Sequence, residues 1–192
     1  MEIGKTLNAK NKKQWRAWLS KNYKTAKDVW LVFHNKASEK KGIPYDDAVE
    51  EALCFGWIDS TVKKLNPDSR VQRFSPRRAK SPYSELNKQR LAKMAAKGKV
   101  LKKILSSVQP LLEQEFKHSK DIIAELMADE KAWTYFQAFP DEYQRIRISF
   151  IESARKRPDE FRKRLAYFIK MTRQGKMYGS RVRKHSREPA KY

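Results

Sequence analysis

The sequence predicts an α+β fold, in which a small antiparallel sheet with flanking helices is followed by a helical C-terminal region and a basic tail. Three observations support this prediction. Segments with strand character and helical segments are mixed through about residue 97, and beyond that point only helical apolar spacing continues, to about residue 170. Apolar residues make up 40% of the chain and aromatic residues 11%, which argues against global disorder. The last residues are polar and mostly basic.

The first elements follow from side-chain spacing. Residues 9–22 place Trp15, Trp18 and Leu19 at i, i+3 and i+4, so their side chains share one face of a helix. Residues 28–35 are rich in β-branched and aromatic side chains, which is typical of a buried strand. We therefore expect a helix followed by a strand.

A second helix and a hairpin come next. Asp46 or Asp47 is expected to cap a helix that ends at Gly56. Residues 57–65 and 70–75 have strand character, and the Asn-Pro-Asp-Ser segment between them has the composition of a tight turn. These two strands should therefore pair antiparallel.

The remainder is predicted to be helical. Ser84 should cap a helix that runs to about residue 97, where Gly98 ends it. Pro110 should break or kink the helix expected over residues 100–116. Further helices are expected after Ser119, over residues 130–138, from Pro140 to about residue 156, and from Pro158 onward.

These patterns divide the chain into three parts. Residues 1–98 should form an α+β domain, residues 99–172 a helical region, and residues 173–192 a disordered basic tail. The tail is either a solvated extension or an electrostatic arm for a polyanion.

Positive charge is distributed along the whole chain. There are 44 Lys and Arg residues against 22 Asp and Glu residues, a formal net charge of +22. Residues 1–96 and residues 97–192 each carry an excess of 11 positive charges. Because such a field attracts polyanions, we expect an anionic partner: a nucleic acid, a phosphorylated ligand or an anionic surface.

Composition and motifs exclude several classes of protein. The single cysteine leaves no internal disulfide and no multi-cysteine metal site. No apolar run approaches the ~18 residues of a membrane span. The N-terminus lacks the apolar core of a secretory signal, so we expect a cytoplasmic protein with no transmembrane segment. Metal-ligand, P-loop and dinucleotide motifs are missing, so neither a metal nor a cofactor is expected.

The loop before the helix at Ser84 is the strongest candidate site. A helix start presents N–H groups without intrahelical partners and the positive end of the helix dipole, and both favour an anion. Basic and polar side chains surround this start. The expected anion-binding residues are Arg77, Arg78, Lys80, Ser81, Ser84, Asn87, Lys88 and Arg90.

Two alternatives to this site are open. The arginines of the loop could instead form ion pairs with Glu50, Glu51 or Asp59, which would make the loop purely structural. Cys54 could act as a nucleophile beside an acid–base pair, but a buried structural cysteine is the favoured interpretation. No catalytic residue is assigned.

Aromatic residues and further basic clusters extend the nucleic-acid interpretation. Phe74 and Tyr83 adjoin the basic loop and could stack on unpaired bases. Residues 145–147, 155–157 and 162–164 are basic clusters on predicted helices. They form either one basic flank or an ordinary solvated surface.

Several motifs resemble the YdeI/OmpD-associated family, also called bacteriocin-protection proteins. They are YDDAVEEALCFGWIDS at residues 45–60, FSPRRAKSPYSELNKQRL at residues 74–91, and the opening pattern of Trp15, Trp18 and Leu19. The segment AFPDEYQRIRISFIESARK is similar to the closing part of the family. The resemblance implies a compact fold shared with YjbR-like and frataxin-like domains, and a role in resistance to antimicrobial peptides or bacteriocins.

Together, these observations predict a non-enzymatic anion-binding protein with a role in stress or antimicrobial-peptide resistance. One alternative is a general DNA- or RNA-binding protein, whose affinity would fall steeply with salt. The other is an enzyme that acts on a phosphorylated small molecule in the loop around Arg77.

Overall fold

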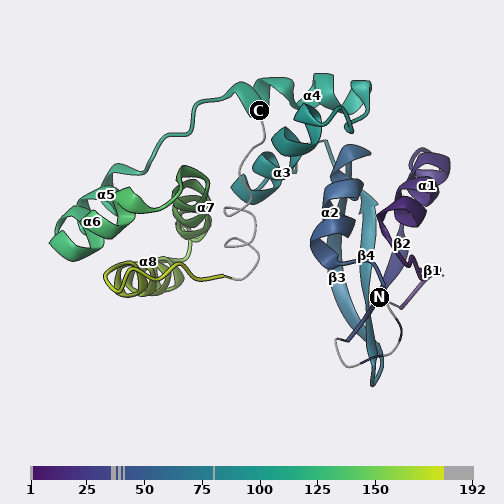
Figure 1. Cartoon of the computed structure of the whole chain (residues 1–192), viewed down its shortest axis with the longest axis horizontal. Helices are drawn as coiled ribbons and strands as arrows, with labels where there is room; N and C mark the ends of the chain where they lie inside the picture. The colour runs from purple at the N-terminus through teal and green to yellow at the C-terminus, as the bar shows by residue number, and fades with distance from the viewer. Residues whose placement is uncertain (1, 36–37, 39, 41, 80, 180–192) are drawn as a thin grey trace. The chain divides into compact units, whose positions relative to one another are not determined.

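The computed structural model describes residues 2–35, 38, 40, 42–79 and 81–179 (Figure 1). The chain divides into two compact units. The first comprises Met1–Pro82 and Arg90–Leu112, and the second comprises Tyr83–Gln89 and Glu113–Tyr192. The predicted α+β class with a helical C-terminal region is confirmed. Most of the predicted basic tail, residues 180–192, lies outside the described residues.

The first unit contains a four-stranded sheet with the strand order β1-β2-β4-β3. The strands are β1 (Thr6–Leu7), β2 (Val29–His34), β3 (Trp57–Asn66) and β4 (Ser69–Pro76). The β3–β4 and β2–β4 pairs are antiparallel, as predicted for the hairpin, but β1 runs parallel to β2. The sheet is therefore mixed rather than purely antiparallel. With two residues, β1 is too short to produce an alternating pattern in the sequence.

Two helices pack on this sheet. They are α1 (Lys12–Asn22) and α2 (Tyr45–Cys54), which lies along the sheet in Figure 1. Trp15 of α1 is fully buried, meets the ring of Phe74 edge-on at 5.4 Å, and donates from Nε1 to the carbonyl oxygen of Ala48 at 2.9 Å. The tryptophan spacing thus identified the buried face of the helix.

The next two helices are α3 (Glu85–Ala96) and α4 (Lys102–Glu113). Ser84 acts as predicted, because its hydroxyl accepts a hydrogen bond from the backbone N–H of Asn87 at 3.3 Å. Gly98, with φ +64°, follows the end of α3. Helix α4 includes Pro110, so the expected break at that proline does not occur.

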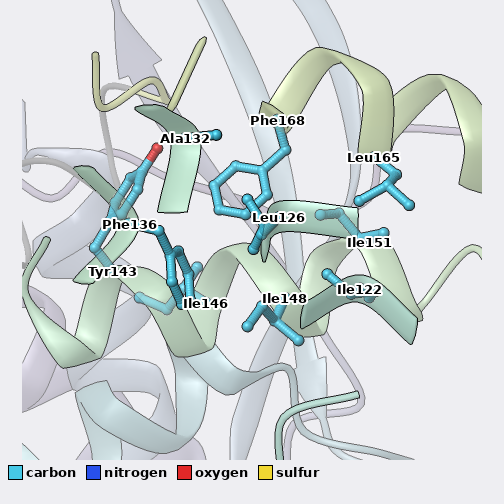
Figure 2. Packing of buried hydrophobic residues seen from close by; sticks show 10 residues of the cluster. All are labelled: Ile122, Leu126, Ala132, Phe136, Tyr143, Ile146, Ile148, Ile151, Leu165 and Phe168. Carbon is cyan, nitrogen blue, oxygen red and sulfur yellow. The ribbon is translucent and has the colours of Figure 1, made fainter. Parts of the chain in front are cut away.

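The second unit is built from four more helices: α5 (Lys120–Met127), α6 (Glu130–Ala138), α7 (Asp141–Glu152) and α8 (Pro158–Thr172). Their apolar faces form one core (Figure 2). The core residues are Ile122, Leu126, Ala132, Phe136, Tyr143, Ile146, Ile148, Ile151, Leu165 and Phe168. In the part of the chain that the structure describes, no helix has the length and apolarity needed to cross a bilayer.

Candidate anion-binding site

The predicted loop site uses its first arginine to hold the loop itself. Arg77 donates from Nη2 to the carbonyl oxygens of Ser81 at 3.1 Å and Pro82 at 2.9 Å. Arg78 is exposed. Lys80 lies outside the described residues. The Arg77 guanidinium is thus committed, at least in part, to backbone acceptors.

Beyond the loop, the predicted residues have separate surroundings. Asn87 and Lys88 are partly buried on the first turn of α3. Arg90 is buried, 4% exposed, and its guanidinium forms an ion pair with Asp46 at 2.7 Å. A buried, paired arginine holds helices together more readily than it captures a ligand.

The acidic residues named in the structural alternative pair with other partners. Glu51 is buried and accepts from Arg16 at 2.7 Å. Glu50 lies 3.5 Å from the ammonium group of Lys12. Asp59 accepts a hydrogen bond from the hydroxyl of Tyr45 at 2.6 Å. The carboxylates therefore join α1, α2 and β3 rather than the arginine loop.

The two aromatic residues predicted to stack on unpaired bases, Phe74 and Tyr83, cannot both do so. Phe74 is fully buried against Trp15, so its ring faces no solvent, and Tyr83 is partly buried. Cys54 is also fully buried, and burial raises the pKa of its thiol to about 11. A thiol with this pKa is a poor nucleophile at neutral pH, which agrees with a structural role.

The second unit holds a different cationic group, Arg147 of α7. Its side chain is 7% exposed. The guanidinium carbon lies 4.7 Å from the ring centre of Tyr178, 5.2 Å from that of Phe150 and 5.9 Å from that of Tyr143. Three aromatic rings therefore surround one buried positive charge.

Arg147 is only partly satisfied by its surroundings, because the phenol of Tyr178 forms a side-chain hydrogen bond with it. Its Nε is buried and has no hydrogen-bond partner. The ion pairs between carboxylates and basic side chains among the described residues all involve other cations. Aromatic rings attract a cation through their quadrupoles, but they accept no strong N–H hydrogen bonds. Arg147 is therefore a buried cation whose Nε has no hydrogen-bond partner.

The segment after α8 fixes the geometry around Arg147. The backbone N–H of Tyr178 donates to the hydroxyl oxygen of Tyr143 at 3.0 Å, which anchors the Tyr178 ring beside the guanidinium. Burial raises the pKa of the Tyr178 phenol above its usual range, although Arg147 acts in the opposite direction. Tyr178 consequently stays neutral at physiological pH and does not serve as a counter-charge.

Arg164 of α8 is the second arginine of the cluster, and it is already paired. It donates from Nε to Glu160 at 2.7 Å and from Nη1 to the carbonyl oxygen of Phe150 at 2.8 Å. Its guanidinium carbon lies 3.9 Å from the ring centre of Phe150. Arg164 therefore covers the Phe150 ring and has its own partners in Glu160 and the Phe150 carbonyl.

Two surface hollows lie elsewhere in the second unit. One, of ≈ 650 Å³, is mostly apolar and is lined by Ile123, Met127, Trp133 and Phe136, among others. The other, of ≈ 510 Å³, has mixed charges, with Glu85 and Glu115 beside Lys88 and Lys117. No group of three or more potential metal ligands occurs among the described residues.

Sequence analysis identified the basic clusters that contain Arg147 and Arg164, but it could not tell a site from a solvated helix surface. A signal for the site was nonetheless present. Tyr143 and Phe150 stand at i−4 and i+3 from Arg147, so all three share a face of α7. The ring of Tyr178 also lies beside Arg147, but Tyr178 is not part of α7. The helical periodicity of α7 therefore does not reveal this contact.

Comparison with known families gives two matches along the chain. Residues 7–107 match the family described as a domain of unknown function (DUF8412), and residues 115–175 match the family described as bacteriocin-protection, YdeI or OmpD-associated. The predicted resemblance is thus confirmed for the C-terminal helices, whereas the motifs at residues 45–60 and 74–91 fall within the first match. No curated protein and no solved structure matches the chain.

Proposed function

We propose that this chain, which belongs to the family of the domain of unknown function DUF8412, is an oxyanion-binding protein with Arg147 as its binding residue. The observation that carries the proposal is the buried, aromatic-framed guanidinium without a described carboxylate partner. The ligand group is a phosphate or a carboxylate. The site belongs to the part of the chain that matches the bacteriocin-protection family, so a role in such protection is proposed with it.

The energetics favour a bound anion. The desolvation free energy of a charge buried without a counter-ion is on the order of several kcal/mol, even after the surroundings relax. A phosphate or carboxylate oxygen would satisfy guanidinium N–H groups with charge-assisted hydrogen bonds, and arginine presents these donors in a planar fork that suits such a ligand. The net charge of +22 adds long-range attraction for any anionic molecule.

We infer binding rather than catalysis. The groups that surround Arg147 are phenol and phenyl rings, and Tyr178 keeps its proton because burial raises its pKa. A role of the loop around Arg77 in anion binding, and a cytoplasmic location, stay predictions from the sequence.

The test measures binding of tripolyphosphate to the full chain by calorimetry at about physiological ionic strength, where surface charges are partly screened. Arg147→Gln should lower the affinity about tenfold or more, because charge-assisted hydrogen bonds are lost. Arg162→Gln is the matched control: it removes the same charge from an exposed arginine of α8 that pairs with Asp159. This control should change the affinity less than twofold, roughly, as expected of surface charge.

If Arg147→Gln and Arg162→Gln lower the affinity for tripolyphosphate equally, binding depends on net charge alone, and the proposed site at Arg147 is refuted. Since Arg147→Gln could unfold the second unit, Arg147→Lys is a further variant. It keeps the charge but loses the planar fork, so it should also weaken binding. Unchanged binding by a folded Arg147→Lys protein, together with unchanged binding by Arg147→Gln, would likewise refute the proposal.

A further inference from the structure

The residues around Arg147 continue into a row, here called the aromatic–arginine ladder, in which rings and guanidinium groups alternate from Tyr178 onward. In order, it consists of Tyr167, Tyr178, Arg147, Phe150 and Arg164. The ring centres of Tyr167 and Tyr178 are 4.9 Å apart and nearly perpendicular. Arg147 lies 4.7 Å from the Tyr178 ring and 5.2 Å from the Phe150 ring, and Arg164 lies 3.9 Å from the Phe150 ring.

Two rings of the ladder are open to solvent. Tyr167 is 48% exposed and Phe150 is 42% exposed. In the described part of the chain, the only other aromatic side chain of comparable exposure is Tyr135. Single exposed aromatic residues are common on proteins and need no explanation. Here, however, Phe150 lies beside Arg147, and Tyr167 lies one ring further away, next to Tyr178. The exposed rings and the buried arginine therefore belong to one row of residues.

We propose that the ligand of this site is single-stranded nucleic acid, with a backbone phosphate on Arg147 and an unpaired base against the exposed ring of Tyr167. This inference rests on the proposed function, since it names the molecule that supplies the oxyanion. Proteins that bind single strands combine positive groups that follow the backbone with aromatic rings on which bases stack. The ladder supplies both within one short row of residues.

The alternation of groups distinguishes this ligand from two others. A duplex keeps its base faces stacked inside the helix, so exposed rings gain nothing from it. A membrane surface favours a continuous apolar face with charges along its rim. In the ladder, by contrast, a guanidinium stands beside the rings of both Tyr178 and Phe150. Alternating bases and phosphates in a flexible strand match this pattern.

The experiment uses the full chain and a fluorescein-labelled oligothymidylate, whose binding is followed by fluorescence anisotropy. Tyr167→Leu removes an exposed ring but leaves an apolar side chain. It should weaken oligothymidylate binding about tenfold, the scale expected for the loss of one stacked base. It should leave the affinity for tripolyphosphate unchanged. Tyr135→Leu, which removes an exposed tyrosine outside the ladder, should change neither affinity.

The outcomes separate this inference from the proposed function. If Arg147→Gln weakens both ligands while Tyr167→Leu weakens neither, the anion site stands and the single-strand assignment is wrong. If Arg147→Gln weakens neither, the proposed function fails. A DNA duplex of equal length that binds as tightly as the single strand would overturn the inference. Arg147-dependent binding to phosphatidylserine vesicles without binding to oligothymidylate would overturn it as well.

Discussion

Gly56 follows α2 with a backbone angle that only glycine adopts at low cost. Its φ is +72°, and a Cβ added there would lie 2.8 Å from Cδ1 of Ile104. Gly98 has a similar φ of +64°, but a Cβ added there would meet no atom within 4 Å. The two glycines therefore share the backbone requirement and differ in the space around them.

We expect Gly98→Ala to lower the free energy of unfolding by about 1–2 kcal/mol, the cost of a left-handed backbone in an L-residue. Gly56→Ala should cost more, because Ile104 must also move. In the double variant of Gly56→Ala with Ile104→Val, which removes Cδ1, the two losses should be less than additive. Urea denaturation measures these values. Strict additivity would contradict the contact between residues 56 and 104.

Arg16 holds the most deeply buried carboxylate of the α1–α2 pair. Glu51 is 2% exposed and accepts from Arg16, which also donates to the carbonyl oxygen of Lys99. Arg16→Met should destabilise the fold by about 3 kcal/mol, because an uncompensated buried carboxylate remains. Lys13→Met, an exposed change on the same helix, should stay within about 0.5 kcal/mol. If Arg16→Met and the unchanged protein have equal midpoints in chemical denaturation, the Arg16–Glu51 pair contributes nothing to stability.

Single residues show where sequence reasoning succeeds and where it does not. A cysteine on an apolar helix face predicts burial, and Cys54 is fully buried. Arg90 and Phe74 were predicted to meet a ligand, yet both are internal. Phe74 stands on β4, and it is buried because Trp15 of α1 packs against its ring. The ion-pair partner of Arg90 is Asp46. The two residues are far apart in the sequence, so the pattern of neighbouring residues does not reveal the pair.

At the level of elements, an ion-pair network ties the start of α5 to the end of α7. Arg155, just beyond α7, donates to both Asp121 and Glu152, and Ser119 donates to Glu152 at 2.8 Å. The hydrogen bonds from Arg155 hold the pKa of Asp121 and the pKa of Glu152 below their ordinary values of 3.8 and 4.5.

This network should make stability depend on pH in a defined direction. Since the folded chain binds protons on these carboxylates less readily than the unfolded chain does, the stabilisation is present above their ordinary pKa values and is lost as the pH falls below them. Arg155→Gln should therefore reduce stability at pH 7 but have little effect near pH 2. Thermal denaturation across this range measures the difference, with the exposed Arg162→Gln as the control. A loss of equal size at both pH values would contradict the network.

Element types were predictable, whereas several element ends were not. The helix assignments rested on periodicity, which α1 and α8 display. The assignment of β2 rested on its run of β-branched and aromatic residues, nearly all of which are buried. The start of α2 was misplaced because the helix begins directly after Pro44. Asp46 and Asp47 lie within its first turn, where their negative charges interact favourably with the positive end of the helix dipole. Helix α4 tolerates Pro110 near its C-terminal end.

At the level of the whole molecule, the sequence combines two family matches, one on each side of residue 110. The resemblance to the YdeI/OmpD-associated family was based mainly on motifs in the N-terminal part of the chain. The confirmed match to that family lies in the C-terminal part. The net charge of +22 predicted an anionic partner without locating its site, because charge is spread over both halves. We propose Arg147 as the site because its side chain is buried and three aromatic rings surround its guanidinium.

The central claim is that the Arg147 guanidinium binds an oxyanion. The NMR resonance of its Nε–H group reports such binding most directly. The resonance is assigned by its disappearance in Arg147→Lys and followed by ¹⁵N NMR while the full chain is titrated with tripolyphosphate. We predict that it shifts with saturation and moves further than the Nε–H resonance of Arg162. An Arg147 resonance that stays fixed while those of exposed arginines move would contradict the account.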